Sequence, residues 1–198
     1  MTLHVRPYQQ DDLAALYQIC LLTADGGKDA SHLFHDPDLV GHYYSAPYGV
    51  LEPQTCFVVT LNGQVCGYVV GTQDSSNFAK RCEQEWFGQW RQKYPLPDCP
   101  STSLSDRLVS HIHQGYAPRP EYADYPAHLH INLLPQTQGH GVGRKIMKAF
   151  IDNLKQNRVT GLHLEVSAKN ASAIAFYERM GFKPIATFEH SIGYGMKL

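Results

Sequence analysis

Three glycines at alternate positions, Gly139, Gly141 and Gly143, stand between an apolar segment and an amphipathic one. Glycine lets the backbone approach a ligand closely, and the free N–H groups at a helix start, with the helix dipole, favour a bound phosphate. Residues 138–160 carry five Lys or Arg against one Asp, a net charge of +4 in a chain of net charge -1. This stretch therefore predicts a cradle for a polyanionic ligand.

The spacing of these glycines excludes two common phosphate-binding motifs. A dinucleotide-binding loop requires G-x-G-x-x-G, and its third glycine would fall on Arg144. A Walker loop, G-x-x-x-x-G-K-[ST], requires glycine at the same position. A merely flexible turn is the remaining alternative, and the flanking strand, helix and basic charge disfavour it.

Length and composition favour a globular protein. With 198 residues, 43% hydrophobic and 18% charged, the chain has enough apolar material for a core, and we expect a single domain over residues 1–198. Its near-neutral charge offers no whole-chain attraction to nucleic acid or anionic lipid. No segment reaches the roughly 20 apolar residues of a membrane span, and no signal-peptide pattern is present. We expect a soluble, cytoplasmic protein whose oligomeric state, monomer or homodimer, is left open.

The five cysteines are odd in number and widely spread, which argues against a disulfide framework and a cysteine zinc site. Cys56 and Cys66 flank an Asn62-Gly63 pair, the favoured type I′ hairpin turn. With that turn Cys66 lies opposite Val59, so the two sulfur atoms are out of register. We interpret all five cysteines as reduced thiols.

Hydrophobic periodicity predicts strands and helices along the whole chain. Before the hairpin of residues 56–61 and 64–72 we expect a strand over 3–6, a helix over 11–22 and a short helix after Pro37. Residues 74–126 do not follow this pattern: we expect two helices there, and we interpret the segment as an insertion within the domain. The remaining segments alternate, which implies a parallel strand pair: strand 127–134, helix 141–154, strand 162–166, helix 171–180 and two short strands within 182–198.

Two motifs resemble those of the GNAT N-acetyltransferases. Gln138-x-x-Gly141-x-Gly143 resembles the acetyl-coenzyme-A signature Q/R-x-x-G-x-G/A of that family. The later run Asn170-Ala171-x-Ala173-x-x-Phe176-Tyr177-x-x-x-Gly181-Phe182 resembles its second motif. Arg6-Pro7-Tyr8 and residues 128–135 are similar to bacterial relatives of the acetyltransferase-like domain of eukaryotic O-GlcNAcases. The implied α/β (α+β) fold is a GNAT-like mixed central sheet of six to seven strands flanked by helices, with the helical insertion between strands 3 and 4.

The resemblance implies an acetyl-CoA-dependent N-acetyltransferase. A primary amine would attack the acetyl group directly in a ternary complex. One alternative is a non-catalytic acyl-CoA-binding module. Another is a protein-interaction domain that uses the Tyr- and Trp-rich insertion as its contact surface.

The same resemblance assigns the coenzyme site. Backbone N–H groups of the loop would hold the pyrophosphate: Gln138, Gly139, His140, Gly141, Val142, Gly143 and Arg144. The main chain of Leu133 and Leu134 would pair with the pantetheine arm, and an N–H near Leu134 would face the carbonyl oxygen. Tyr177 would protonate the leaving thiolate, unless Phe176-Tyr177 is a core aromatic pair. Asn170 fits a helix N-cap and could also contact the coenzyme.

The general base is less clearly indicated. Alternation along a strand places His128, His130 and Asn132 on one face, and His163 with Glu165 on one face of the next strand. Glu165 and His130 are the candidate catalytic bases, with a satisfied structural role or a water chain as alternatives. The paired histidines of the chain lack a tetrahedral ligand set, so we expect no metal site.

An acidic stretch gives one indication of the acceptor. Residues 11–38 carry six Asp against one Lys, a net charge of -5. Asp25 and Asp29 are therefore candidates for attracting a protonated amine, and a solvated acidic loop would explain the pattern equally well.

Overall fold

The chain folds around one seven-stranded sheet, and the computed structural model describes residues 3–97, 103–137 and 139–198. The strands are β1 (Leu3–Pro7), β2 (Phe57–Leu61), β3 (Gln64–Thr72), β4 (Ala127–Leu133), β5 (Gly161–Ser167), β6 (Lys183–Thr187) and β7 (Ser191–Lys197). Their order is β1-β2-β3-β4-β5-β7-β6, and within the described ranges only β4 and β5 are parallel. The predicted mixed sheet flanked by helices is confirmed.

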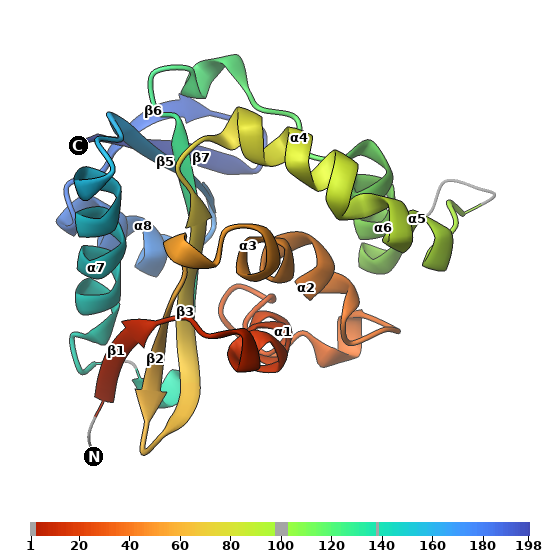
Figure 1. The fold of residues 1–198 in the computed structure, drawn as a ribbon, viewed down its shortest axis with the longest axis horizontal. Coiled ribbons are helices and arrows are strands. Elements are labelled where there is room, and N and C mark those ends of the chain that lie inside the picture. Colours follow the sequence, from red (N-terminus) through yellow and green to blue (C-terminus); the bar gives the residue numbers. More distant parts are fainter. Residues whose placement is uncertain (1–2, 98–102, 138) are drawn as a thin grey trace.

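Helices cover both faces of the sheet (Figure 1). One face, here called the insertion face, carries α1 (Leu13–Leu21), α2 (Leu39–Tyr44), α3 (Ala46–Leu51), α4 (Ser75–Glu85), α5 (Phe87–Lys93) and α6 (Leu104–Gln114). The other, the α7 face, carries α7 (Val142–Gln156) and α8 (Ala171–Arg179). Among the described residues, no helix has the length and apolar character needed to cross a bilayer.

Two short helices differ from the expectation. Helix α3 was not predicted, because Pro47 and Gly49 disfavour a helix; Pro47 stands in the first turn, where proline is tolerated. The first helix of the insertion divides at Trp86 into α4 and α5. The insertion itself lies between β3 and β4, as expected.

The hairpin turn forms at Asn62 and Gly63, whose φ angles are 51° and 86°. A β-bulge between Val59 and Thr60 places Gly67, not Cys66, opposite Val59, so the expected register is wrong by one residue. The cysteines at positions 20, 56, 66 and 82 are buried free thiols, and Cys99 lies outside the described residues.

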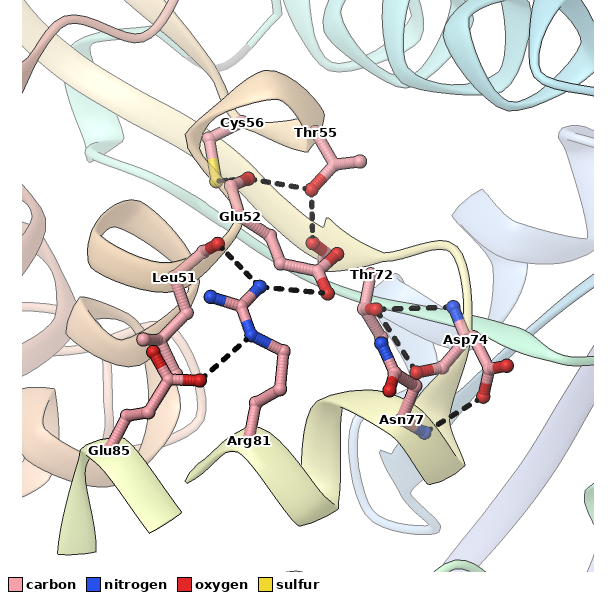
Figure 2. Close-up of polar contacts among 10 residues, drawn as sticks. Leu51, Glu52, Thr55, Cys56, Thr72, Asp74, Asn77, Arg81 and Glu85 are labelled. Carbon is pink, nitrogen blue, oxygen red and sulfur yellow. Dashed lines mark hydrogen bonds and ion pairs between the residues drawn. The ribbon is translucent and has the colours of Figure 1, made fainter. Parts of the chain in front are cut away.

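The start of α4 ties the insertion to the rest of the molecule (Figure 2). Asp74 caps this helix by accepting a hydrogen bond from the Asn77 amide at 2.9 Å. Arg81 donates to the Leu51 carbonyl at 2.9 Å and lies 3.9 Å from the buried carboxylate of Glu52. Burial raises the pKa of Glu52, and Arg81 opposes that shift. These contacts hold α4 against the end of α3.

His42, on α2, is buried among aromatic rings with one hydrogen bond to its ring. Its Nδ1 lies 2.8 Å from the Tyr17 hydroxyl, and its ring stacks on Trp90 with centroids 3.5 Å apart. Nε2 has no hydrogen-bond partner in the described part of the chain. Burial, together with the charge of Lys93, lowers the pKa of His42 to about 4.

We expect the folded state to lose stability as the pH falls below about 6.5. The unfolded chain protonates His42 near that pH, whereas the folded protein does so only near pH 4. The stabilisation is therefore complete above pH 6.5 and decreases by about 1.4 kcal/mol per pH unit between the two pKa values. Denaturant unfolding at a series of pH values should show a shallower decrease in His42→Phe, which keeps the ring stack. The same decrease in His42→Phe as in the exposed-site control His4→Phe would contradict this assignment.

Candidate functional site

The glycine loop connects β4 to α7 through a short turn, Pro135–Thr137. Gly139 and Gly141 have φ angles of +79° and +68°, in the left-handed region that favours glycine, and Gly141 is the N-cap of α7. A Cβ at Gly143 would lie 3.2 Å from Leu133 Cδ1 and 3.4 Å from the Phe176 ring. Each glycine therefore meets a local requirement: two for the turn and one for close packing between α7, β4 and α8.

A cavity of about 600 Å³ lies beside this loop on the α7 face. Its walls are formed by β4, the loop, the first turn of α7 and one side of α8: Ile131, Leu133, Thr137, Gly139, Gly141, Val142, Gly143, Arg144, Ser172, Ala173, Phe176, Tyr177, Arg179 and Met180. The structure thus brings most of the predicted loop residues together with Leu133 and Tyr177. Leu134, His140 and Asn170 do not line the cavity, and Gln138 lies outside the described residues.

The cavity wall is suited to an anion. The first backbone N–H groups of α7 have no acceptor within the helix, and they belong to residues that line the cavity. Arg144 and Arg179 add positive charge to the same wall. Sequence analysis missed the α8 contributors Ser172, Phe176 and Arg179, although their helical spacing places them on one side of α8 with Ala173 and Tyr177.

Next to the cavity, the parallel pairing of β4 with β5 ends and the two strands separate. Their ladder contains only Ala127 with Leu162 and His128 with His163. Beyond it, the β4 edge that faces β5 has no strand partner from the described part of the chain over Leu129–Leu133, which leaves main-chain groups for an extended ligand.

The register of β4 corrects one expectation about that edge. The Leu134 amide donates to the Cys66 carbonyl of β3 at 3.0 Å, so it is not free to face a carbonyl oxygen. Amides alternate in direction along a strand, and the β3–β4 register is unbroken. The amides of Leu133 and Ile131 therefore point toward the gap, and the amide of Leu134 does not.

Tyr177 reaches the cavity from α8. Its side chain is 9% exposed and packs against the rings of Phe176 and Phe182, while its hydroxyl has no protein partner among the described residues. Burial raises the pKa of Tyr177 to about 12, so the hydroxyl keeps its proton at neutral pH. Asn170 is the N-cap of α8, accepting from the Ala173 amide at 3.1 Å, which confirms the capping interpretation.

The histidines of β4 face the opposite way, toward the insertion face. His128 is enclosed: its Nε2 lies 2.8 Å from the Tyr48 hydroxyl and its Nδ1 lies 2.7 Å from Ser75 Oγ. Because Ser75 Oγ donates to the Pro126 carbonyl at 2.7 Å, we assign the His128 proton to Nδ1. Burial holds the pKa of His128 well below its usual value, and both ring nitrogens are occupied.

His130 differs from His128 in having no hydrogen bond to its ring from the described residues. It packs edge-on against Tyr44 and Tyr48, with ring centroids 5.6 and 5.5 Å away. Burial, with a smaller effect of His163, lowers the pKa of His130 to about 4. The ring is therefore neutral at physiological pH and has a lone pair to which no described residue donates.

Glu165, the other candidate base, is held by several donors. Ser191 Oγ donates to Oε1 at 2.5 Å, the Tyr122 hydroxyl donates to Oε2 at 3.0 Å, and Arg119 Nε lies 3.5 Å from Oε2. Both carboxylate oxygens of Glu165 therefore already accept hydrogen bonds from other side chains.

The acidic loop after α1 lies near β4, because Asn132 Nδ2 donates to Thr23 Oγ1 at 2.6 Å. Asp25 and Asp29 are both exposed. The Ser31 hydroxyl and amide bind Asp29 Oδ1 and lower the pKa of that carboxyl. The structure thus places the loop beside the strand without directing either carboxylate at a described group of the cavity.

Comparison with known proteins identifies the fold family. Residues 11–182 match the acetyltransferase (GNAT) family. The chain belongs to this family. The crystal structure of SsHAT has 38% sequence identity and a TM-score of 0.93, and the match covers 100% of this chain and 98% of that one.

Two curated proteins that are similar to this GNAT chain differ in kind from each other. Rat (Rattus norvegicus) protein O-GlcNAcase is 27% identical over 188 residues, which are 93% of this chain and 20% of that protein. The chain thus spans about one fifth of that relative's length. The [ribosomal protein bS18]-alanine N-acetyltransferase of Escherichia coli strain K12 is 48% identical over 54 residues, 27% of this chain and 36% of that enzyme.

A more distant GNAT structure was solved with a ligand. PaiA N-acetyltransferase from Thermoplasma acidophilum, in complex with coenzyme A, has a TM-score of 0.62 at 12% identity, with 100% of both chains covered. This likeness shows that the two proteins share the fold.

Proposed function

We propose that this GNAT protein transfers an acetyl group from acetyl-CoA to a primary amine, with both substrates bound together. The observation that carries the proposal is the cavity, because it joins the glycine loop, the unpaired β4 edge and the Tyr177 hydroxyl in one space. Family membership and a coenzyme-bound neighbour of the same fold support it.

The loop and the strand edge would hold the coenzyme. The amides of residues 139–144 would bind the pyrophosphate, aided by Arg144, while the main chain of Leu133 and Ile131 would pair with the pantetheine arm. Gly139 and Gly141 fit this role because no atom lies within 4 Å of the position of a Cβ at either residue. When bound, acetyl-CoA supplies an activated acetyl thioester.

The chain's own side chains would then move the protons. The ammonium form of the acceptor first loses one proton to water so that its nitrogen can attack. His130, neutral and without a donor among the described residues, accepts the second proton as the nitrogen bonds to the acetyl carbon and becomes acidic. Tyr177 donates its proton to the leaving sulfur and is reprotonated from solvent. Asp25 and Asp29 would contribute a negative rim that attracts the cationic acceptor.

Mass spectrometry of a panel of primary amines and peptide N-termini, incubated with the protein and acetyl-CoA, tests the proposal. We expect at least one acetylated product, formed together with an equal amount of free coenzyme A. Release of coenzyme A without an acetylated amine would indicate hydrolysis only. Acetyl-CoA binding with no product from any amine would favour the non-catalytic acyl-CoA-binding module instead.

A further inference from the structure

A short stretch of the insertion, residues 119–122, is seated on the insertion face of the C-terminal strands. The Tyr122 ring lies flat on His163, with centroids 4.1 Å apart and an interplanar angle of 14°. This position requires glycine beneath it, because a Cβ at Gly193 of β7 would lie 2.5 Å from the Tyr122 hydroxyl oxygen. The insertion therefore reaches β5 and β7.

This stretch contacts the carboxylate of Glu165, which keeps lone pairs that can accept further hydrogen bonds. An ionised carboxylate offers about four lone-pair positions. Described side chains donate to two of them, Ser191 Oγ at 2.5 Å and the Tyr122 hydroxyl at 3.0 Å. Burial and the Glu165 charge keep the pKa of Tyr122 far above its usual value, so this hydroxyl remains a donor.

The cation beside Glu165 is loosely paired. Arg119 Nε is 3.5 Å from Oε2, a contact that meets the distance for an ion pair and makes no hydrogen bond, and the two side chains are 48% and 33% exposed. The Arg119 guanidinium also lies over the Phe188 ring, 4.1 Å from its centroid. If another cation binds the Glu165 carboxylate, the Arg119 guanidinium can keep its contact with the Phe188 ring.

Glu165 also borders the gap between β4 and β5. It lies two residues beyond His163, the last β5 residue of the ladder, and shares the face of His163. His130 holds the corresponding position on β4, two residues beyond His128. Tyr44, whose ring packs on His130, is close enough for Glu165 to contribute, after burial and Cys20, to the rise of the Tyr44 pKa to about 12. The two side chains therefore flank the gap on the face opposite the coenzyme cavity.

We propose that Glu165 binds the ammonium group of a cationic aliphatic amine, oriented by Tyr122 and Ser191, with Arg119 as the counterion that the amine displaces. The assignment of this amine as the acetyl acceptor rests on the proposed function. Glu165 is then a recognition group, and proton removal is left to His130 across the gap. The proposal excludes neutral alcohols as ligands of this position, since a carboxylate held by two donors and a cation gains little from one more neutral donor.

NMR titration of the labelled protein with n-butylamine at pH 7.5, beside n-butanol as the neutral isostere, tests this site without acetyl transfer. We expect butylamine to shift the amide signals of Ser191 and Gly193 and the Arg119 side-chain N–H signal, and butanol to leave them in place. Glu165→Gln should weaken butylamine binding by about tenfold, the worth of one hydrogen bond to a charged group. Arg119→Gln should strengthen it by about threefold, because a competing surface ion pair is removed.

Glu178→Gln is the matched control. Like Glu165, Glu178 accepts a hydrogen bond from a tyrosine hydroxyl, here that of Tyr194 on β7 at 3.0 Å, but Glu178 itself lies on α8. This variant should bind butylamine as the parent does. Equal weakening by Glu165→Gln and Glu178→Gln, butanol shifts equal to those of butylamine, or no gain from Arg119→Gln would each overturn the site. Because the titration measures no turnover, a negative result leaves the acetyltransferase proposal intact. A protein that lacks acetyltransferase activity can still bind butylamine at Glu165.

Discussion

Replacement of Gly141 by glutamate is expected to weaken acetyl-CoA binding by at least about a hundredfold. Gly141 has φ +68° at the first turn of α7 and lines the cavity, with no atom within 4 Å of a Cβ position. A carboxylate there would repel the coenzyme phosphates and compete for the same amides. Loss of two charge-assisted hydrogen bonds, each worth about 1.5–3 kcal/mol, accounts for a decrease of this size. Isothermal titration calorimetry measures it directly.

Two controls separate charge from backbone strain. Gly63→Glu places the same residue at another glycine with positive φ, +86°, and open surroundings, at the tip of the β2–β3 hairpin. It should lower stability as Gly141→Glu does and bind acetyl-CoA normally. His140→Glu adds a carboxylate to the same loop without replacing glycine, and we expect an intermediate loss. If the folded parent does not bind acetyl-CoA, or if Gly141→Glu binds it as well as Gly63→Glu does, the cavity is not the coenzyme site.

The glycine loop could be read from sequence because its causes are local. Positive φ at Gly139 and Gly141 depends on the turn itself, and the helix that follows shows its own periodicity. The side of α8 that enters the cavity follows equally from helical spacing. Phe176 and Arg179 stand three residues apart, as do Ala173 and Phe176.

The direction of the Leu134 amide could not be read in this way. Residues 129–134 look like any half-buried strand, and nothing in them indicates that the ladder with β5 ends at His128. Whether an amide on β4 is free depends on which residue of β3 stands opposite, and the bulge near Val59 shows that register can shift by one.

The contacts of Glu165 could not be predicted from sequence either, because they join residues that are far apart along the chain. Tyr122 and Arg119 lie more than 40 residues before it, in an insertion whose path across β5 and β7 has no local signature. Alternation correctly placed Glu165 on the face of His163, and the donors that occupy both of its carboxylate oxygens became visible only in the structure.

Substitution of Tyr177 by phenylalanine is expected to lower kcat by about tenfold or more while leaving acetyl-CoA binding unchanged. The ring packing against Phe176 and Phe182 is retained in this variant, so only the hydroxyl is lost. That hydroxyl has no protein partner among the described residues. Its pKa, raised to about 12 by burial, keeps it protonated at neutral pH, as a proton donor to the leaving thiolate must be. Steady-state kinetics with the best amine of the panel, beside calorimetric titration with acetyl-CoA, measures the two quantities separately.

Tyr194→Phe provides the control for Tyr177→Phe, because Tyr194 is also a buried tyrosine of the α7-face core, and its hydroxyl donates to Glu178 at 3.0 Å. Loss of that hydroxyl should lower stability by about 1 kcal/mol and leave kcat intact. Departure of the coenzyme A thiolate depends on acid assistance to a different degree with different acceptors, so the comparison uses one amine for all variants. Unchanged kcat in Tyr177→Phe would remove the general-acid role and leave Tyr177 as a core aromatic that shapes the cavity wall. A parallel decrease in both variants would attribute the effect to packing of the α7-face core, since that is what the two tyrosines share.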